Sequence, residues 1–311
     1  MPQDPLRIHL SLVSHTNVGK TTLARTLLLK DVGEVADRAH VTETTDDYVL
    51  ARSSTGGELI LWDTPGFGNS VALAKRLEGR GNPLGWFLSE VWDRFTDRSF
   101  WLDQRSVRHI RDVTSVVLYL VNAAEPPEKA PYIPAEMQIL AYIGKPVIVL
   151  LNQMGKPRPP EEEVAELAHW KTSLAEYPFV TEVLPMDAFA RCWVQEAALF
   201  DAVGRAVQPE QQSVFEELRL SWTRARRAVY ASAVEALARH VWLQASAHEW
   251  VENAGFSTKV KSVAKKLGLF STVADPIADA QTALSVRAAD SFCALTNTLI
   301  ELHGLRGRGV S

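Results

Sequence analysis

The apolar positions of this sequence form two different patterns, one before and one after about residue 208. In the first part, apolar runs of strand length alternate with stretches of helical spacing. Strands are predicted at 7–13, 47–52, 58–62, 114–121, 146–151 and 180–184. Helices are predicted at 20–30, 134–142, 161–175 and 192–206. Because apolar strands separated by helices indicate a mostly parallel sheet covered on both faces, we predict a three-layer α/β domain over residues 1–208.

Two features interrupt this alternation. The turn "SSTGGE" (53–58) joins the second and third predicted strands and makes them a hairpin. Residues 82–112 are longer than one connecting helix requires, and six aromatic residues fall between 86 and 101. We interpret this segment as an insertion. Its rings either form a partner-binding surface, since aromatics dominate binding hot spots, or pack an extra helix onto the sheet or the C-terminal region.

After residue 208 the pattern is helical only. Apolar residues recur at helical spacing in 212–250 and 276–303, which predicts a long helical hairpin or small bundle. We therefore expect an all-α C-terminal domain over 209–311. Its short basic amphipathic piece at 259–270 is either a surface for anionic lipid or RNA, or a solvated helix face.

Composition narrows the class of protein. Hydrophobic residues make up 46% and charged residues 23%, as in ordinary water-soluble globular proteins, and the net charge of -4 gives no support for nucleic-acid binding through overall charge. Two cysteines are too few for a disulfide scaffold and fit a cytoplasmic protein. The first 13 residues lack the organisation of a signal peptide, and no apolar run reaches the ~20 residues of a membrane span. We expect a cytoplasmic protein, with attachment to the periphery of the inner membrane as the alternative.

The stretch "LVSHTNVGKTTLARTL" (12–27) runs from a predicted strand into a predicted helix. It fits the phosphate-loop pattern G-x-x-x-x-G-K-[ST], except that Ser14 stands at the first glycine. Amides at a helix N-terminus favour bound phosphates, and Gly19 lets the backbone approach them closely. We expect Lys20 to bridge the β- and γ-phosphates and the Thr21 hydroxyl to bind Mg²⁺. The predicted phosphate-binding set is Asn17, Val18, Gly19, Lys20, Thr21 and Thr22.

Two further segments supply the other groups that a Mg²⁺-bound triphosphate needs. In "LILWDTPGF" (59–67), a strand ends at Asp63, which is expected to hold Mg²⁺ through water, and the Gly66 amide is expected to point at the γ-phosphate. The loop "VTETTDD" (41–47) can close over Mg²⁺ and the γ-phosphate, or is a threonine-rich loop without a ligand. Three threonines compete for the closing role: Thr42, Thr44 and Thr45.

Over roughly residues 5–205, these motifs resemble the Era/TrmE-like branch of bacterial small GTPases, of the translation-factor type. "NVGKTTL", "ETTDD" and "DTPGF" stand where that branch has "NVGKSTL", a threonine pair followed by Arg-Asp, and "DTPG". "GEVADRAHVTETT" and "LLNQMG" further resemble a bacterial group with an Era-like domain and an uncharacterised helical C-terminal region. The resemblance implies a Ras-like P-loop NTPase fold, a mostly parallel three-layer α/β domain followed by helices.

The resemblance also implies roles for single residues. Thr45 becomes the preferred switch threonine, so that the implied metal ligands are Thr21, Thr45 and Asp63. A potassium ion can replace an arginine finger in that branch, and Asn17 then helps to bind it. The alternative for Asn17 is a local backbone hydrogen bond. The expected catalytic set is Asn17, Lys20, Thr45 and Gly66.

The match is weaker where the nucleobase is read. The branch uses N-K-x-D, whose aspartate accepts two hydrogen bonds from guanine, whereas "LLNQMGKP" keeps Asn152 but has Gln153 for the lysine and Gly155 for the aspartate. The usual S-A-K loop corresponds to "PMDAFAR" (185–191), where Asp187 is either a compensating carboxylate or a turn or N-cap residue. The predicted base site is Asn152, Gln153, Asp187 and Ala188. GTP is the expected nucleotide, with ATP or relaxed specificity as the alternative.

We predict Mg²⁺-dependent hydrolysis of GTP to GDP and phosphate by a nucleotide-dependent switch. Phe67 follows "DTPG" where a water-orienting glutamine would stand, so turnover should be slow without an activator or potassium. Beside this GTPase stand two alternatives: an ATPase or low-specificity NTPase, and a nucleotide-binding scaffold with negligible hydrolysis. His15 in the loop is either a structural residue or an acid or base.

Beyond GTP and GDP, several partner classes stay open. They are a protein partner at the aromatic insertion or the helical domain, RNA or the ribosome, a membrane surface and a second copy of the chain, because relatives of one fold serve many processes.

Overall fold

The computed structural model of the chain describes residues 6–16, 18–28, 46–68, 70–78, 98–156, 158–188, 193–251 and 276–303. The chain divides into two compact units, Met1–Arg226 and Arg227–Ser311. Most of the aromatic insertion (82–97) and the basic piece at 259–270 lie outside the described residues. Nowhere in the described part of the chain is a helix both long and apolar enough to cross a bilayer.

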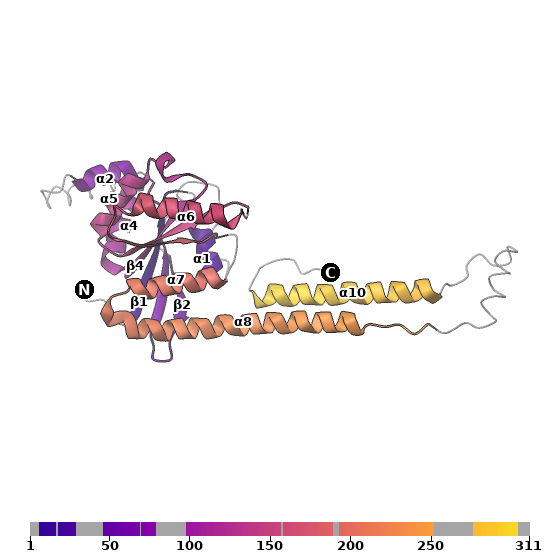
Figure 1. The fold of residues 1–311 in the computed structure, drawn as a ribbon. Coiled ribbons are helices and arrows are strands. Elements are labelled where there is room, and N and C mark those ends of the chain that lie inside the picture. The colour runs from indigo at the N-terminus through magenta and orange to yellow at the C-terminus, as the bar shows by residue number, and fades with distance from the viewer. Residues whose placement is uncertain are drawn as a thin grey trace, which may run out of the picture. The chain divides into compact units, whose positions relative to one another are not determined.

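The first unit is built on a sheet with strand order β2-β3-β1-β4-β5-β6 (Figure 1). Its strands are β1 (Arg7–Ser14), β2 (Asp46–Arg52), β3 (Glu58–Asp63), β4 (Val116–Asn122), β5 (Val147–Asn152) and β6 (Val180–Pro185). β2 pairs with β3 antiparallel, as the predicted hairpin, and the other neighbours pair parallel. Every predicted strand is present close to its predicted ends, which confirms the mostly parallel sheet.

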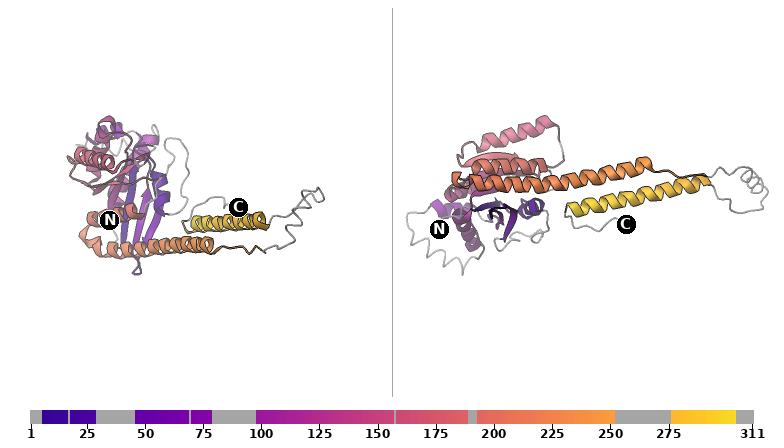
Figure 2. Two further views of the ribbon diagram at one scale, coloured as in Figure 1. Left: turned by 45° about the vertical axis from the view of Figure 1, so that its right-hand side comes forward. Right: turned by 90° about the horizontal axis from the view of Figure 1, so that it is seen from below.

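Helices cover both faces of this sheet, as Figures 1 and 2 show. They are α1 (Lys20–Leu28), α2 (Ser70–Glu78), α4 (Arg98–Val113), α5 (Ile133–Ile143), α6 (Pro160–Leu174), α7 (Trp193–Ala206) and the first turns of α8 (Gln212–Ser246). Alternate residues of β4 point to opposite faces. Leu118 and Leu120 join the buried cluster of α1, α7 and α8, whereas Val117, Tyr119 and Val121 join that of α2, α4, α5 and α6. The predicted three-layer fold is confirmed.

The carboxyl ends of the parallel strands lie along one edge of the sheet. β1 ends at Ser14, β3 at Asp63 and β5 at Asn152, and all three belong to parallel pairs. In open α/β sheets, ligands bind outside this edge. The fold therefore brings together the three segments that the sequence predicts to bind a nucleotide.

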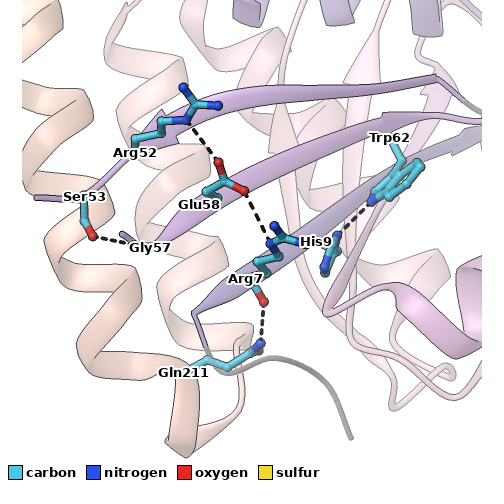
Figure 3. Close-up of polar contacts among 8 residues, drawn as sticks. All are labelled: Arg7, His9, Arg52, Ser53, Gly57, Glu58, Trp62 and Gln211. Atoms are coloured by element: carbon cyan, nitrogen blue, oxygen red, sulfur yellow. Dashed lines mark hydrogen bonds and ion pairs between the residues drawn. The ribbon is translucent and has the colours of Figure 1, made fainter. Parts of the chain in front are cut away.

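The opposite edge is held by contacts among its own side chains (Figure 3). Glu58 at the start of β3 pairs with Arg7 of β1 at 3.4 Å and with Arg52 of β2 at 3.1 Å. Gln211, in the short 3₁₀ turn η2 (Pro209–Gln211), donates its Nε2 to the Arg7 carbonyl at 3.1 Å. These contacts join β1, the hairpin and the segment that leads into α8 at the edge away from the phosphate loop.

The described helices of the second unit are the rest of α8 and α10 (Pro276–Leu302), and residues 247–251 after α8 are not helical. His240 Nδ1 and Ser291 Oγ are 2.8 Å apart, so these two helices contact each other. The unit boundary falls inside α8, whereas the pattern boundary at 208 falls just before it. The reason is that the first turns of α8 pack on α7, where Trp222 stacks on Phe200 with ring centroids 4.2 Å apart.

Candidate functional site

The loop between β1 and α1 has the backbone that the phosphate-loop pattern requires. Gly19 has φ +96°, and a Cβ on it would lie 2.7 Å from Asn152 Nδ2, so glycine is needed both for conformation and for space. The Leu23 amide donates to the Gly19 carbonyl at 3.0 Å, which starts the helix there. Asn17 lies outside the described residues. The loop therefore delivers the N-terminus of α1 to the carboxyl edge of the sheet.

Lys20 lies buried between the loop and the second predicted segment. Its Nζ donates to Ser14 Oγ at 3.1 Å, so the serine at the first glycine position supplies an acceptor for this cation. A Cβ on Gly66 would lie 2.9 Å from Lys20 Nζ and 3.4 Å from the Ser14 carbonyl. The next amide, of Phe67, donates to that same carbonyl at 3.0 Å. Gly66 is thus placed against the loop, as its predicted role requires.

The two described candidates for Mg²⁺ ligands are in contact. Thr21 Oγ1, in the first turn of α1, donates to Asp63 Oδ2 at the end of β3 at 2.8 Å, and Asp63 is 3% exposed. A hydroxyl and a carboxylate oxygen are hard ligands of the kind that Mg²⁺ prefers. The residues present therefore fit this ion. Thr22 follows in the same turn, and its carbonyl accepts from Thr26 Oγ1 at 3.1 Å. Thr42, Thr44 and Thr45 lie outside the described residues.

At the base end, Asn152 joins three segments. It is fully buried at the end of β5. Its Nδ2 donates to the Val18 carbonyl of the phosphate loop at 2.6 Å, and its Oδ1 accepts from the Ala188 amide after β6 at 2.8 Å. Thr26 Oγ1 of α1 donates to the Ala188 carbonyl at 2.7 Å. The predicted residues Val18, Asn152 and Ala188 therefore meet, and Asn152 is the residue that connects them.

The other predicted base-site residues surround this connection. Gln153 has φ 58° and Gly155 φ 78°, so the chain makes a left-handed turn directly after β5. A Cβ on Gly155 would meet no heavy atom within 4 Å. Asp187 directly precedes Ala188 and is partly exposed. The structure thus brings the loops of the predicted base site together, and the space beside Gly155, where the resembled branch has an aspartate, is open.

A buried carboxylate behind the phosphate loop was not predicted. Glu136 of α5 is fully buried, with Oε1 2.7 Å from His15 Nδ1, and it accepts from the Tyr119 hydroxyl at 2.6 Å. Burial raises the pKa of Glu136, and the bonds to His15 and Tyr119 oppose this rise. Burial, together with Glu136, raises the pKa of Tyr119 well above its ordinary value. Tyr132 stacks on the His15 ring at 4.2 Å between centroids, so His15 is held on two sides, which favours its structural interpretation.

The sequence carried one signal for Glu136. It is the charged residue in "IPAEMQILAYI" (133–143), a helix with otherwise uncharged side chains. A single acid on such a helix indicates a buried partner, but it does not say which one.

A known protein family matches the segment that carries the phosphate loop. Residues 9–153 match the family described as "50S ribosome-binding GTPase". Among curated proteins, none matches the chain. Similar solved structures include a variant of Era from Aquifex aeolicus bound to GDP·AlF4⁻, at 19% identity over 65% of this chain and 57% of that chain, with a TM-score of 0.46.

Two further solved structures are similar to this chain. Era in complex with MgGDPNP and nucleotides 1506–1542 of 16S ribosomal RNA is 20% identical over 65% of this chain and 57% of that chain, with a TM-score of 0.46. The FeoB G-domain from Methanococcus jannaschii is 15% identical over 64% of this chain and 97% of that domain, with a TM-score of 0.37. The chain therefore spans little more than half the length of the Era chains that it matches.

The family match covers β1 to the turn after β5, which are the elements that carry the phosphate loop, Asp63 and Asn152. The sheet order and the position of the loop at its carboxyl edge are those of a Ras-like P-loop domain. Residues 9–153 therefore match the P-loop GTPase domain described as "50S ribosome-binding GTPase", and the described C-terminal elements α8 and α10 are helical.

Proposed function

We propose that the protein hydrolyses GTP to GDP and phosphate in a Mg²⁺-dependent reaction and acts as a nucleotide-dependent switch. The observation that carries this proposal is the contact of 2.8 Å between Thr21 Oγ1 and Asp63 Oδ2. This contact supports the proposal because it holds a hydroxyl and a carboxylate oxygen together beside the N-terminus of α1, which would receive the phosphates.

The phosphates would be held by Lys20 and by the amides that open α1. Lys20 Nζ donates to the neutral Ser14 hydroxyl at 3.1 Å. A charged phosphate oxygen is a stronger acceptor than a hydroxyl, so a bound triphosphate would take over this donor. The Gly66 amide would donate to the γ-phosphate, because Gly66 lies against Lys20. These donors would stabilise the oxygens on which negative charge grows during the reaction.

Thr21 and Asp63 would hold Mg²⁺, with Thr45 as the third proposed ligand. When bound, the ion neutralises charge on the β- and γ-phosphates. Asp63 is buried and hydrogen-bonded, so it is fixed before any ligand arrives. Thr45 stays a prediction because it lies outside the described residues.

Slow turnover is also part of the proposal. The residue after "DTPG" is Phe67, whose side chain is 1% exposed and carries no group that can orient a water. We propose that an activator or a potassium ion at Asn17 supplies the missing stabilisation. The hydrogen bond from the Phe67 amide to the Ser14 carbonyl links the segment after β3 to the phosphate loop. This link supports the proposal that the segment responds to the bound nucleotide.

Phosphate release from GTP tests this function. We expect release in Mg²⁺, none in EDTA, and faster release in K⁺ than in Na⁺ at equal ionic strength. Thr21→Ala and Asp63→Ala should each remove the Mg²⁺-dependent release, whereas Thr172→Ala, at an exposed threonine of α6, should leave it unchanged. Asn17→Ala should remove the K⁺ effect.

Two outcomes would contradict the proposal. Release by Thr21→Ala and Asp63→Ala at the wild-type rate would remove both residues from the site. GTP binding without release under any salt would indicate a nucleotide-binding scaffold instead.

Partners and location belong to the same proposal. The family match supports GTP and GDP as ligands, and the protein would work in the cytoplasm or at the periphery of the inner membrane. Proposed partners are a protein that binds the aromatic insertion or the helical region, RNA or the ribosome, and a second copy of the chain. The family description names the 50S ribosome for its members. The domain assignment, with 1–208 as the nucleotide-binding domain and 209–311 as the helical one, stays part of this proposal.

A further inference from the structure

We propose that the base site accepts guanine and adenine nucleotides with little preference between them, and that Gly155 is the residue that determines this. The inference rests on the proposed function, since it concerns the other end of the same nucleotide. It follows from what each residue of the base loops contacts.

The side-chain amide of Asn152 is used in hydrogen bonds within the protein. Its Oδ1 accepts from the Ala188 amide at 2.8 Å and its Nδ2 donates to the Val18 carbonyl at 2.6 Å, in a fully buried position. An amide that turned toward a base would leave a buried backbone donor and a buried acceptor unsatisfied. Asn152 therefore fixes where the base loops lie and does not choose which base binds.

Gly155 has no side chain that could distinguish guanine from adenine. In the branch that the motifs resemble, a carboxylate at this position accepts from two donors of guanine, N1–H and the N2 amino group, whereas adenine presents an acceptor at N1. A carboxylate therefore attracts guanine and repels adenine, and a buried partner of this kind gives large discrimination. Glycine offers neither effect. The space beside Gly155 is open, since a Cβ there would meet no heavy atom within 4 Å.

The neighbouring polar residues do not replace that carboxylate. Gln153 carries both a donor and an acceptor in its amide, so it can pair with either base. Within residues 152–156 and 186–188, Asp187 is the one acidic residue. It is partly exposed, and water competes for hydrogen bonds to an exposed carboxylate, which limits the discrimination that it can give.

Competition binding on the full-length chain tests the proposal. Unlabelled GTP and ATP would each displace a fluorescent GTP analogue in the presence of Mg²⁺. We expect the two dissociation constants of the wild type to agree within ~10-fold, whereas a site with a buried reading group separates such ligands by ~10⁴-fold. Gly155→Asp should raise the preference for GTP by ~100-fold, which corresponds to about one or two charge-assisted hydrogen bonds.

Gly155→Asn is the matched control. Asparagine has nearly the same size as aspartate and suffers the same strain at φ 78°, but it carries no charge. We expect its preference to stay near that of the wild type. If both variants fail to fold, the ratio of the wild-type dissociation constants for GTP and ATP still tests the proposal.

Three results would overturn the proposal. The first is a wild-type preference for GTP over ATP above ~100-fold. If Asp187→Asn then lost this preference, Asp187 would be the residue that recognises guanine. The second is a folded Gly155→Asp variant whose preference equals that of Gly155→Asn. The third is that neither GTP nor ATP binds. This result would also contradict the proposed function, whereas the first two results would not affect it.

Discussion

The two ends of the nucleotide site are built on different principles. At the proposed phosphate end, recognition would combine the Lys20 side chain with backbone features: the Gly19 turn, the N-terminus of α1 and Gly66 placed against the loop. At the base end, recognition in related sites depends on one side chain, and here that position is Gly155. Backbone geometry tolerates sequence change, as Ser14 at the first glycine shows, whereas a missing carboxylate removes a contact outright.

We infer that the phosphate end determines whether a nucleotide binds and that the base end determines which nucleotide binds. The proposed phosphate end would hold any triphosphate through the charge of Lys20 and the backbone amides, because the phosphates are common to all these nucleotides. The base end is anchored by the two hydrogen bonds of Asn152, yet anchoring positions the loops without selecting a base. Substitutions at the two ends should therefore have different signatures: loss of all nucleotides at one end, and a change in the ratio between them at the other.

Lys20→Ala should have the largest effect. It removes the buried cation of the phosphate end, so GTP and ATP should both bind at least ~100-fold more weakly, which corresponds to about 3 kcal/mol. Isothermal titration with each nucleotide measures this, and Lys171→Ala, at an exposed lysine of α6, is the control. An unchanged affinity for both nucleotides would contradict the assignment of the phosphate end.

Asn152→Ala should have the next largest effect, and on stability first. It leaves the Ala188 amide and the Val18 carbonyl without their partner, so the free energy of unfolding should fall by about 2–4 kcal/mol. Affinity for GTP and ATP should fall together, with their ratio unchanged.

Asn122 provides a matched control, because it pairs with Asn152 across β4 and β5 and accepts one exposed hydrogen bond, from the Ala124 amide at 3.0 Å. Asn122→Ala should cost about 1 kcal/mol in denaturant unfolding. Equal costs for the two variants, or a changed GTP-to-ATP ratio in Asn152→Ala, would refute the scaffold role of Asn152.

Glu136→Gln should give the smallest effect, visible as a pH dependence. Burial raises the folded-state pKa of Glu136 above its ordinary value of 4.5. Folding then binds a proton, so this group contributes stability that is fully present below pH 4.5 and is lost as the pH rises through the raised pKa. The difference in unfolding free energy, wild type minus variant, should therefore fall as the pH rises from 4.5. A difference that rises over this range would show the opposite sign, and Glu161→Gln, at an exposed glutamate, is the control.

Much of the fold and of the phosphate end could be predicted from the sequence. The apolar strands are continuous and the phosphate loop is a local motif between a strand and a helix, so neighbouring residues suffice to place both. The Thr21–Asp63 contact follows from two such motifs, because parallel strands end on the same edge.

The supporting contacts could not be predicted in the same way. Asn152 was expected to help bind the base, but its partners Val18 and Ala188 lie 134 and 36 residues away in the sequence. Glu136 meets His15 across 121 residues. No local pattern encodes such pairs, because tertiary packing decides which buried donor meets which acceptor.

The initial rate of phosphate release from GTP and from ATP, at saturating nucleotide, with Mg²⁺ and with EDTA, tests the comparison between the two ends most directly. We predict slow release from both nucleotides at similar rates, and no release in EDTA. Release that persists in EDTA would contradict the account of the phosphate end. Release from GTP alone would contradict the account of the base end.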